Sequence, residues 1–161
     1  MDQPGLDRRQ HERALTALGR INVVSRTVPS VWRVIRAAAA ATPGRPLRIL
    51  DIACGGGQLS VALAKRMDRE GIAGEVLGCD LSPVAVEYAT ALAARAGVSQ
   101  VHFAPLDVLR DSWPQGFDVV HCSLFLHHLA DRDVVVVLQK MAHAAGRLVV
   151  VTDLRRTDLG F

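Results

Sequence analysis

The chain has 161 residues, enough for one domain with a sizeable buried core. Half of the residues are apolar and 22% are charged, which is typical of a globular protein and excludes a disordered one. No apolar run approaches the roughly 20 residues that a membrane span needs, and the polar amino terminus lacks the apolar segment of a signal peptide. The three cysteines, an odd number without metal-ligand spacing, fit a reduced protein, so we expect a cytoplasmic location and no metal site.

The net charge of +3 comes from basic residues that are scattered along the chain. Aromatic residues make up only 4% of the sequence, and few lie among the arginines. This pattern favours a mildly basic surface over a nucleic-acid groove, so nucleic acid is a disfavoured partner.

Two amphipathic helices are predicted ahead of the main fold. The apolar residues that keep helical spacing are Leu6, Leu15, Leu18 and Ile21 in the first helix, and Val28, Val31, Trp32 and Ile35 in the second. The helix-breaking segment Thr42-Pro43-Gly44-Arg45-Pro46 follows them. We therefore predict an N-terminal helical cap over residues 1–44 and a core over residues 45–161.

Short apolar strands alternate with helices after this segment. Strands are predicted at Leu47–Ala53, Glu75–Leu81, Val101–Pro105, Phe117–Ser123 and Arg147–Thr152. Helices are predicted after the first, second and fourth strands. This alternation predicts an α/β fold with three layers, in which a mostly parallel sheet has helices on both faces. In such sheets ligands bind at the carboxyl ends of the strands, near the point where the strand order reverses.

A run of glycines, Gly55-Gly56-Gly57, follows Cys54 in the first strand-to-helix turn. Glycines allow a ligand to approach the backbone, and the helix that follows presents free N–H groups to an anion. The run alone is weak evidence, because a tight turn without a ligand can carry it. Asp51, four residues before Gly55, sharpens the interpretation, since a cationic ligand needs a carboxylate there and a dinucleotide pyrophosphate does not.

Two more acids lie at or just past the carboxyl ends of predicted strands. Asp80 ends the second strand, about 20 residues after the glycine run, an offset at which an acid accepts hydrogen bonds from ribose hydroxyls. A helix-capping role is the alternative for Asp80, although Ser82 already supplies a cap. Asp107 lies just past the third strand, where it either accepts from an exocyclic amine or serves as a turn residue.

These acids and glycines, in this order and on these elements, resemble the class I S-adenosylmethionine-dependent methyltransferases, above all those with a methyltransferase domain of the quinone-biosynthesis type. Phe117–Ser123 and the following His127-His128-Leu129 resemble the fourth strand of that family and the turn after it. The resemblance covers roughly residues 45–153. It implies a Rossmann-like sandwich, S-adenosylmethionine as cofactor and S-adenosylhomocysteine as product. The two predicted N-terminal helices resemble the variable cap that such enzymes place over the cofactor.

The resemblance also implies roles for individual residues. The glycine run would receive the methionine end of the cofactor with Asp51 at its ammonium group, and Asp80 would hold both ribose hydroxyls. Asp107 and the backbone of Val108 would meet the adenine, while Cys122 and Ser123 would border the methyl-transfer centre. The expected cofactor-binding residues are Asp51, Ala53, Cys54, Gly55, Gly57, Asp80, Leu81, Asp107, Val108, Cys122 and Ser123. Ala53 departs from the family, which usually has its first glycine at this position.

The implied reaction is an in-line displacement on a sulfonium methyl group, which depends largely on proximity and alignment. A base helps if the acceptor is a hydroxyl or an activated carbon. His127 and His128, after the fourth strand, are the candidates, with a loop-capping role or simple solvent exposure as alternatives. The other histidines in regular elements are interpreted as structural, namely His102, His121 and His143. The cysteines are interpreted as small buried side chains.

Three functions remain open at this point. Methyl transfer to a small-molecule acceptor, by O- or C-methylation, is favoured. A nicotinamide-dependent oxidoreductase shares the glycine turn and the ribose acid, but Ser60 stands where the third position of its fingerprint should be Gly or Ala, and Asp51 and Asp107 argue against it. The third is a non-catalytic or incomplete cofactor-binding or scaffolding domain.

The third function is suggested by the end of the chain at Phe161, because the C-terminal strands six and seven of the family are apparently missing. Arg147–Thr152 would then be an exposed sheet edge. Such an edge invites pairing, so a homo-oligomer or a partner protein at the fifth strand is expected.

Overall fold

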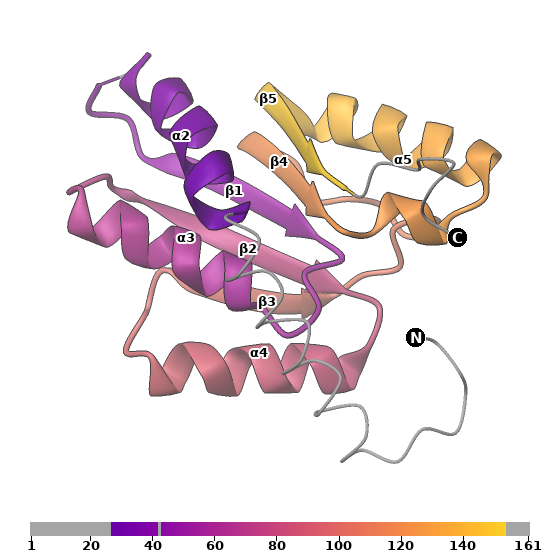
Figure 1. Ribbon diagram of the computed structural model, residues 1–161, viewed down its shortest axis with the longest axis horizontal. Helices are drawn as coiled ribbons and strands as arrows, with labels where there is room; N and C mark the ends of the chain where they lie inside the picture. Colours follow the sequence, from indigo (N-terminus) through magenta and orange to yellow (C-terminus); the bar gives the residue numbers. More distant parts are fainter. Residues whose placement is uncertain (1–26, 42, 154–161) are drawn as a thin grey trace, which may run out of the picture.

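A single parallel sheet forms the centre of the computed structural model, which describes residues 27–41 and 43–153. Its five strands have the order β3-β2-β1-β4-β5 (Figure 1). The strands are β1 (Leu47–Ile52), β2 (Gly74–Asp80), β3 (Val101–Pro105), β4 (Phe117–Ser123) and β5 (Ala145–Thr152). The chain builds outward from β1 to β3 and then returns to place β4 on the other side of β1. The strand order therefore reverses between β1 and β4, which is where ligands bind in sheets of this kind.

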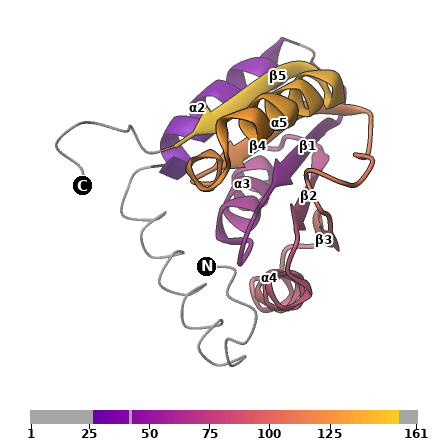
Figure 2. The same cartoon turned by 90° about the vertical axis from the view of Figure 1, so that its right-hand side faces the viewer.

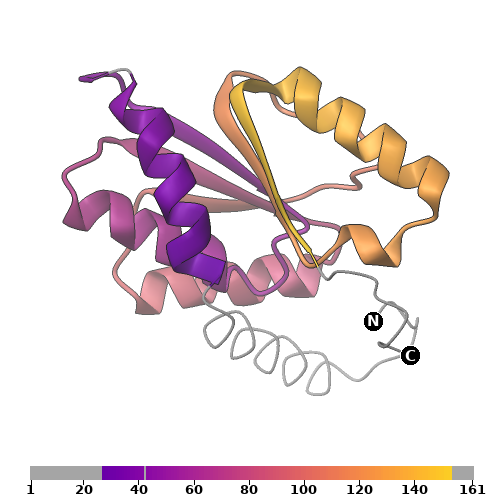
Figure 3. The ribbon, with the colours of Figure 1, turned by 45° about the horizontal axis from the view of Figure 1, so that its top comes forward.

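Helices cover both faces of this sheet. They are α2 (Thr27–Ala40), α3 (Gln58–Arg69), α4 (Pro83–Arg95) and α5 (Asp131–Ala144), with a short 3₁₀ helix η1 (Leu126–His128) after β4. Figure 2 shows α3 between α2 and α4, and Figure 3 shows α5 apart from these three helices, beside β4 and β5. The α/β fold, the three layers and the parallel sheet predicted from the sequence are confirmed.

The alternation of side chains along each strand divides the core into two parts. Ile49 of β1 and Val119 of β4 join one cluster, together with apolar side chains of α2 and α3. Their neighbours Leu50 and Val120 join the other, which includes Met141 of α5. Asp51 and His121 follow the first pair by two residues, so they share its face of the sheet.

The second predicted helix is α2, whereas the first predicted helix lies outside the described residues. Val31, Trp32 and Ile35 of α2 are buried in the same cluster as the sheet. The indole Nε1–H of Trp32 also donates to Glu70 Oε1 at 2.6 Å, just beyond the end of α3. α2 thus forms part of the layer that covers the sheet, and the division at residue 44 stays a prediction.

β5 lies at one edge of the sheet and pairs with β4. It begins at Ala145, two residues before the predicted start at Arg147, so Gly146 lies inside the strand. The backbone already turns to an extended conformation at Ala145, where β5 starts to pair with Phe117. Within residues 27–41 and 43–153 no strand covers the outer side of β5, and the predicted pairing at this edge stays a prediction. No helix in that part of the chain is long and apolar enough to cross a membrane.

Candidate functional site

The turn between β1 and α3 uses backbone conformations that glycine adopts freely. Gly55 and Gly57 have φ angles of 54° and 73°, in the left-handed region. A side chain at Gly57 would place its Cβ 2.6 Å from that of Ala89 in α4 and 2.7 Å from the ring of Phe103 in β3. The glycine therefore lets the start of α3 pack closely against α4 and β3. α3 begins at Gln58 without a side-chain cap. Its first backbone N–H groups are therefore suited to an anionic ligand.

A pocket lies beside this turn, at the carboxyl ends of β1 and β4. Its lining comes from the end of β1, the glycine turn, the start of α3 and the end of β4, namely Asp51, Ala53, Cys54, Gly55, Gly56, Gln58, Leu59, Ser123 and Leu124. Five of the predicted cofactor-binding residues therefore meet here: Asp51, Ala53, Cys54, Gly55 and Ser123. Gly57 lies next to the lining.

Backbone strain is concentrated at the same pocket. Ala53 and Leu124 each have a φ of 51°, and they are the non-glycine residues with positive φ in the described part of the chain. This conformation costs roughly 1–2 kcal/mol for a residue with a Cβ. Both residues line the pocket, and strain that persists in a folded protein tends to cluster at functional sites. The departure at Ala53 thus leaves the turn intact but strained.

Replacing Ala53 by glycine should remove this strain. The relief is partly offset by the greater freedom of glycine in the unfolded chain, so we expect Ala53→Gly to raise the free energy of unfolding by roughly 0.5–1 kcal/mol. Ala62→Gly, inside α3, is the matched control and should lower it by about 1 kcal/mol. Denaturant unfolding of both variants would measure this, and a similar loss in both would contradict the strain at position 53.

Asp51 is a buried acid, with 2% of its surface exposed. Its Oδ1 accepts from the Nδ1–H of His121 at 2.8 Å, and its Oδ2 accepts from the hydroxyl of Ser60 at 2.5 Å. The pairing of β1 with β4 sets Asp51 directly opposite His121. These donors compensate much of the cost of burying a carboxylate. Asp51 also lines the pocket, so its remaining lone pairs stay available to a cation.

His121 continues this network toward β5. Its ring is fully buried, and Nε2 lies 3.5 Å from the hydroxyl of Thr152, which donates to Ser123 Oγ at 3.1 Å. The sequence marked His121 as structural, and the structure adds a specific contact with the predicted site. The signal that could have found it is its position two residues after Val119, on the same face of the sheet as Asp51, once β1 and β4 are known to be neighbours.

His121→Leu should leave the buried Asp51 carboxylate short of a donor. We expect the free energy of unfolding to fall by roughly 3 kcal/mol, because a buried carboxylate loses one of its hydrogen-bond donors. His121→Asn places an amide N–H near the position of Nδ1 and should lose much less. Thermal and denaturant unfolding of the two variants provide the measurement. Equal stability of His121→Leu and the parent chain would contradict the pairing.

Asp80 connects the end of β2 with the glycine turn. Its Oδ2 accepts from the N–H of Gly55 at 2.8 Å, and its Oδ1 accepts from the N–H of Ser82 at 2.9 Å. Ser82 caps α4 as predicted, because its hydroxyl accepts from the N–H of Ala85 at 3.3 Å. The side chain of Asp80 is half-buried, and Leu81 beside it is 62% exposed. A carboxylate with two backbone donors still has lone pairs for a ligand hydroxyl.

Asp107 begins the loop after β3 and caps its first turn. Its Oδ1 accepts from the N–H groups of Leu109 at 2.9 Å and Arg110 at 3.2 Å. The turn role that the sequence left open is therefore real, and the adenine role stays a prediction. Val108, the next residue, is buried.

Lys140, on α5, binds the backbone of the loop that carries Asp107. Its ammonium donates to three backbone carbonyls, those of Val108 at 3.1 Å, Leu109 at 2.8 Å and Asp111 at 3.1 Å. The loop that carries Asp107 is thereby tied to α5. Sequence analysis missed this residue, because a lysine in a helix usually faces water and nothing in the helical pattern marks one that reaches a loop.

The candidate bases lie past β4. His127 is in η1, and its Nδ1 lies 2.6 Å from Oδ1 of Asp153, the residue after β5. The ring of His128 is tilted against that of His127, with centroids 3.9 Å apart. Cys122, expected near the transfer centre, is 1% exposed and belongs to the core on the α5 side, whereas Ser123 reaches the pocket.

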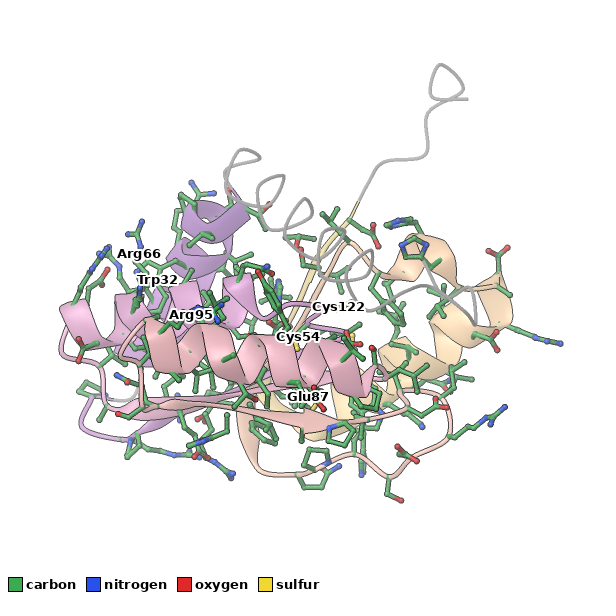
Figure 4. All side chains as sticks on the ribbon, turned by 90° about the horizontal axis from the view of Figure 1, so that it is seen from below. Trp32, Cys54, Arg66, Glu87, Arg95 and Cys122 are labelled. Atoms are coloured by element: carbon green, nitrogen blue, oxygen red, sulfur yellow. The ribbon has the colours of Figure 1, made fainter. Side chains whose placement is uncertain are left out.

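The three cysteines are all free thiols, and all have raised pKa values. Burial is the largest cause for each, and the carboxylate of Asp51 adds to it. The pKa of Cys79 rises to about 11, while those of Cys54 and Cys122, labelled in Figure 4, also lie well above the ordinary thiol value. A raised pKa keeps a thiol protonated at neutral pH, so none of the three is suited to act as a nucleophile.

We expect iodoacetamide to modify the folded chain slowly at pH 7.5, because thiolates are scarce there. The chain unfolded in guanidinium should react much faster, which serves as the control. Because folding raises the pKa of Cys79, its protonated thiol contributes to the free energy of unfolding. This contribution is fully present below the ordinary thiol pKa of 9.0 and is lost as the pH rises toward about 11. Mass spectrometry of alkylated peptides is the measurement, and rapid alkylation of Cys54 in the folded chain would contradict it.

A larger open hollow, of about 700 Å³, lies at the opposite end of the sheet. It is lined by the segments that lead into β2 and β3, including Lys65, Asp68 and Arg69 of α3. Those are the amino ends of the strands, where parallel sheets rarely bind their ligands. The smaller pocket therefore remains the candidate site. Among residues 27–41 and 43–153 no cluster of three or more His, Cys, Asp or Glu side chains could hold a metal ion.

Comparison with known families agrees with this geometry. A model of the methyltransferase domain family matches residues 49–146, which is more than half of the chain. The chain therefore belongs to the methyltransferase domain family, and the resemblance seen in its sequence is confirmed.

Particular relatives are methyltransferases as well. The ubiquinone biosynthesis O-methyltransferase of Idiomarina loihiensis is 32% identical over 111 residues, which cover 68% of this chain and 43% of the relative. That of Xanthomonas campestris pv. campestris is 32% identical over 127 residues, covering 78% and 49%. The chain spans about half the length of the curated relatives it matches.

Solved structures give the same fold. The magnesium protoporphyrin IX methyltransferase of Synechocystis PCC 6803, crystallised with bound SAH (S-adenosylhomocysteine), is 26% identical. It superposes with a TM-score of 0.64 over 78% of this chain and 53% of that one. The Rossmann-like sandwich expected from the sequence is therefore confirmed.

Proposed function

We propose that the chain binds S-adenosylmethionine at the carboxyl ends of β1 and β4 and transfers its methyl group to a small molecule. The observation that carries the proposal is the pocket beside the glycine turn, where a buried carboxylate and an uncapped helix start lie together. Asp51 suits an ammonium group, and the first N–H groups of α3 suit a carboxylate. An amino acid has both groups on one carbon atom, as does the methionine end of this cofactor.

The residues at the carboxyl ends of β2 and β3 fit the rest of the cofactor. Asp80 holds the glycine turn through Gly55 and keeps acceptor capacity for ribose hydroxyls. The loop at Asp107 and Val108, held by Lys140, is suited to the adenine. When bound, the cofactor supplies an electrophilic methyl group. The chain contributes mainly alignment of the acceptor with that group, since positive charge is lost during the transfer.

An oxygen acceptor is supported by the curated relatives, which are named O-methyltransferases. Carbon methylation stays the second possibility. A nicotinamide cofactor is disfavoured, because Asp51 borders the turn and Ser60, at the third fingerprint position, donates to Asp51. A non-catalytic scaffolding role has no specific observation in its favour. We place the protein in the cytoplasm on the strength of its free cysteines.

Asp80→Asn should weaken binding of S-adenosylhomocysteine. The loss of charge-assisted hydrogen bonds, each worth about 1.5–3 kcal/mol, predicts an increase in Kd of roughly 10-fold to 100-fold. Isothermal titration calorimetry of the 161-residue chain is the measurement, with NAD as the control ligand.

Asp68→Asn is the matched control variant. It removes the same charge from an exposed residue near the other end of α3, beside the larger hollow. Its affinity for S-adenosylhomocysteine should equal that of the parent chain. A folded parent chain that binds NAD in preference, or a loss of affinity in Asp68→Asn alone, would overturn the proposed site.

A further inference from the structure

The histidine after β4 and the acid after β5 form a pair that the proposed cofactor contacts leave unused. His127 Nδ1 lies 2.6 Å from Asp153 Oδ1, and the backbone N–H of His127 donates to Asp153 Oδ2 at 3.2 Å. One carboxylate thus holds both the ring and the backbone of the same residue. The side chains are partly buried, with 24% of His127 and 16% of Asp153 exposed. Two contacts of this kind fix the direction of the imidazole ring.

The contact with Asp153 also decides which ring nitrogen is available. An ionised carboxylate only accepts hydrogen bonds, so the proton of the neutral imidazole lies on Nδ1. Nε2 then carries a lone pair. The same division of labour, in which an acid orients a histidine so that its other nitrogen accepts a proton, is known from hydrolytic triads.

The pair lies at the end of the sheet that holds the pocket. His127 follows Ser123 and Leu124, which line the pocket, by a few residues, and Asp153 follows Thr152 directly. β4 and β5 are held together at this point, because the N–H of Leu124 donates to the carbonyl of Thr152 at 2.8 Å and Thr152 Oγ1 donates to Ser123 Oγ. Strained backbone at Leu124 sets the direction in which the chain leaves β4 toward η1.

We propose that His127, oriented by Asp153, is the general base of the reaction and that the acceptor is therefore a compound with a protonated hydroxyl group. The hydroxyl proton passes to Nε2 of His127, and the oxygen electron pair forms the new bond to the methyl carbon. The methyl–sulfur bond breaks with its electron pair on sulfur, which changes the sulfonium into a neutral thioether. The proton leaves His127 for water afterwards. Asp153 is a positioning residue. This inference rests on the proposed function.

Four variants separate a base from a structural contact. His127→Ala removes the ring, whereas His127→Asn keeps an N–H donor near Nδ1 for Asp153 but has no atom at the place of Nε2. Asp153→Asn keeps the size of the positioning residue without its charge. His143→Ala, an exposed histidine near the end of α5, is the matched control.

The first measurement is methyl transfer from labelled S-adenosylmethionine to phenol and to the more acidic 4-nitrophenol, each at saturating and limiting concentrations. Both His127 variants should lower kcat for phenol by roughly 100-fold or more, with little change in KM. The defect should be much smaller with 4-nitrophenol, which ionises without help. Asp153→Asn should lower kcat less than either, and His143→Ala should equal the parent chain.

The second measurement does not depend on the acceptor. Nitrogen-15 NMR of the His127 ring should find the proton on Nδ1 in the parent chain and a shift toward Nε2 in Asp153→Asn. Calorimetry with S-adenosylhomocysteine should give parental affinity for all four variants.

Outcomes of these experiments separate the base from the proposed function. Recovery of phenol methylation in His127→Asn, equal defects with both phenols, or a ring proton on Nε2 in the parent chain would overturn the base. Normal cofactor binding without methylation of either phenol would also overturn the role of His127 as the base. The proposed function would then still stand. Absent cofactor binding in the folded parent chain would remove the proposed function itself.

Discussion

Asp51 carries a carboxylate into the middle of a parallel sheet, where water cannot reach most of it. Such a group is tolerated only when donors surround it, and here they come from α3 through Ser60 and from β4 through His121. The second of these donors depends on the position of β4 beside β1, which sets His121 opposite Asp51 and follows from the reversal of strand order. The reversal also opens the pocket at the strand ends. The reversal of strand order therefore supplies one partner of the buried acid and also opens the pocket for a ligand.

The glycine turn depends on the same place in the fold. The start of α3 approaches α4 and β3 closely because Gly57 has no side chain to meet Ala89 and Phe103. Asp80 then fixes the turn from β2 by accepting the N–H of Gly55. Since Asp80 accepts from Gly55 within this turn and Asp51 accepts from Ser60 in the helix that follows it, the shape of the pocket is largely set before any ligand arrives. A preformed site of this kind loses little entropy on binding.

Much of this architecture was predictable from the sequence. The strands follow from short apolar runs, and the glycine run, Asp51 and Asp80 were recognisable because their chemistry is tied to the ends of strands. The partners of Asp51 were not predictable in the same way. His121 becomes its neighbour only through the pairing of β1 with β4, and local periodicity contains no information on strand order. Asp153 and Lys140 were missed for a related reason, because their contacts reach about 26 and 30 residues along the chain.

The sequence also left Asp107 undecided between two roles, and the structure explains why. An acid that accepts from the N–H groups of Leu109 and Arg110 is a turn residue, and the same geometry keeps it just past β3, at the end of the sheet where we propose that the cofactor binds. The local sequence pattern predicts the turn but contains no information on whether Asp107 also contacts a ligand. Ala53 illustrates the opposite case. The sequence shows only that alanine replaces the usual glycine of the family, and the φ angle reveals that the turn keeps its shape at some cost.

The contacts of Lys140 limit which residues can replace it on α5 without releasing the loop after β3. An ammonium group has three N–H donors arranged around one nitrogen, and each of the three carbonyls of residues 108, 109 and 111 takes one of them. Arginine has the same charge, but its donors lie in a plane and are spread over three nitrogens, so it cannot converge on one point in this way. Position 140 therefore distinguishes between two cations that are usually treated as equivalent. The ammonium group therefore joins the loop to the helix through the geometry of its three donors as much as through its charge.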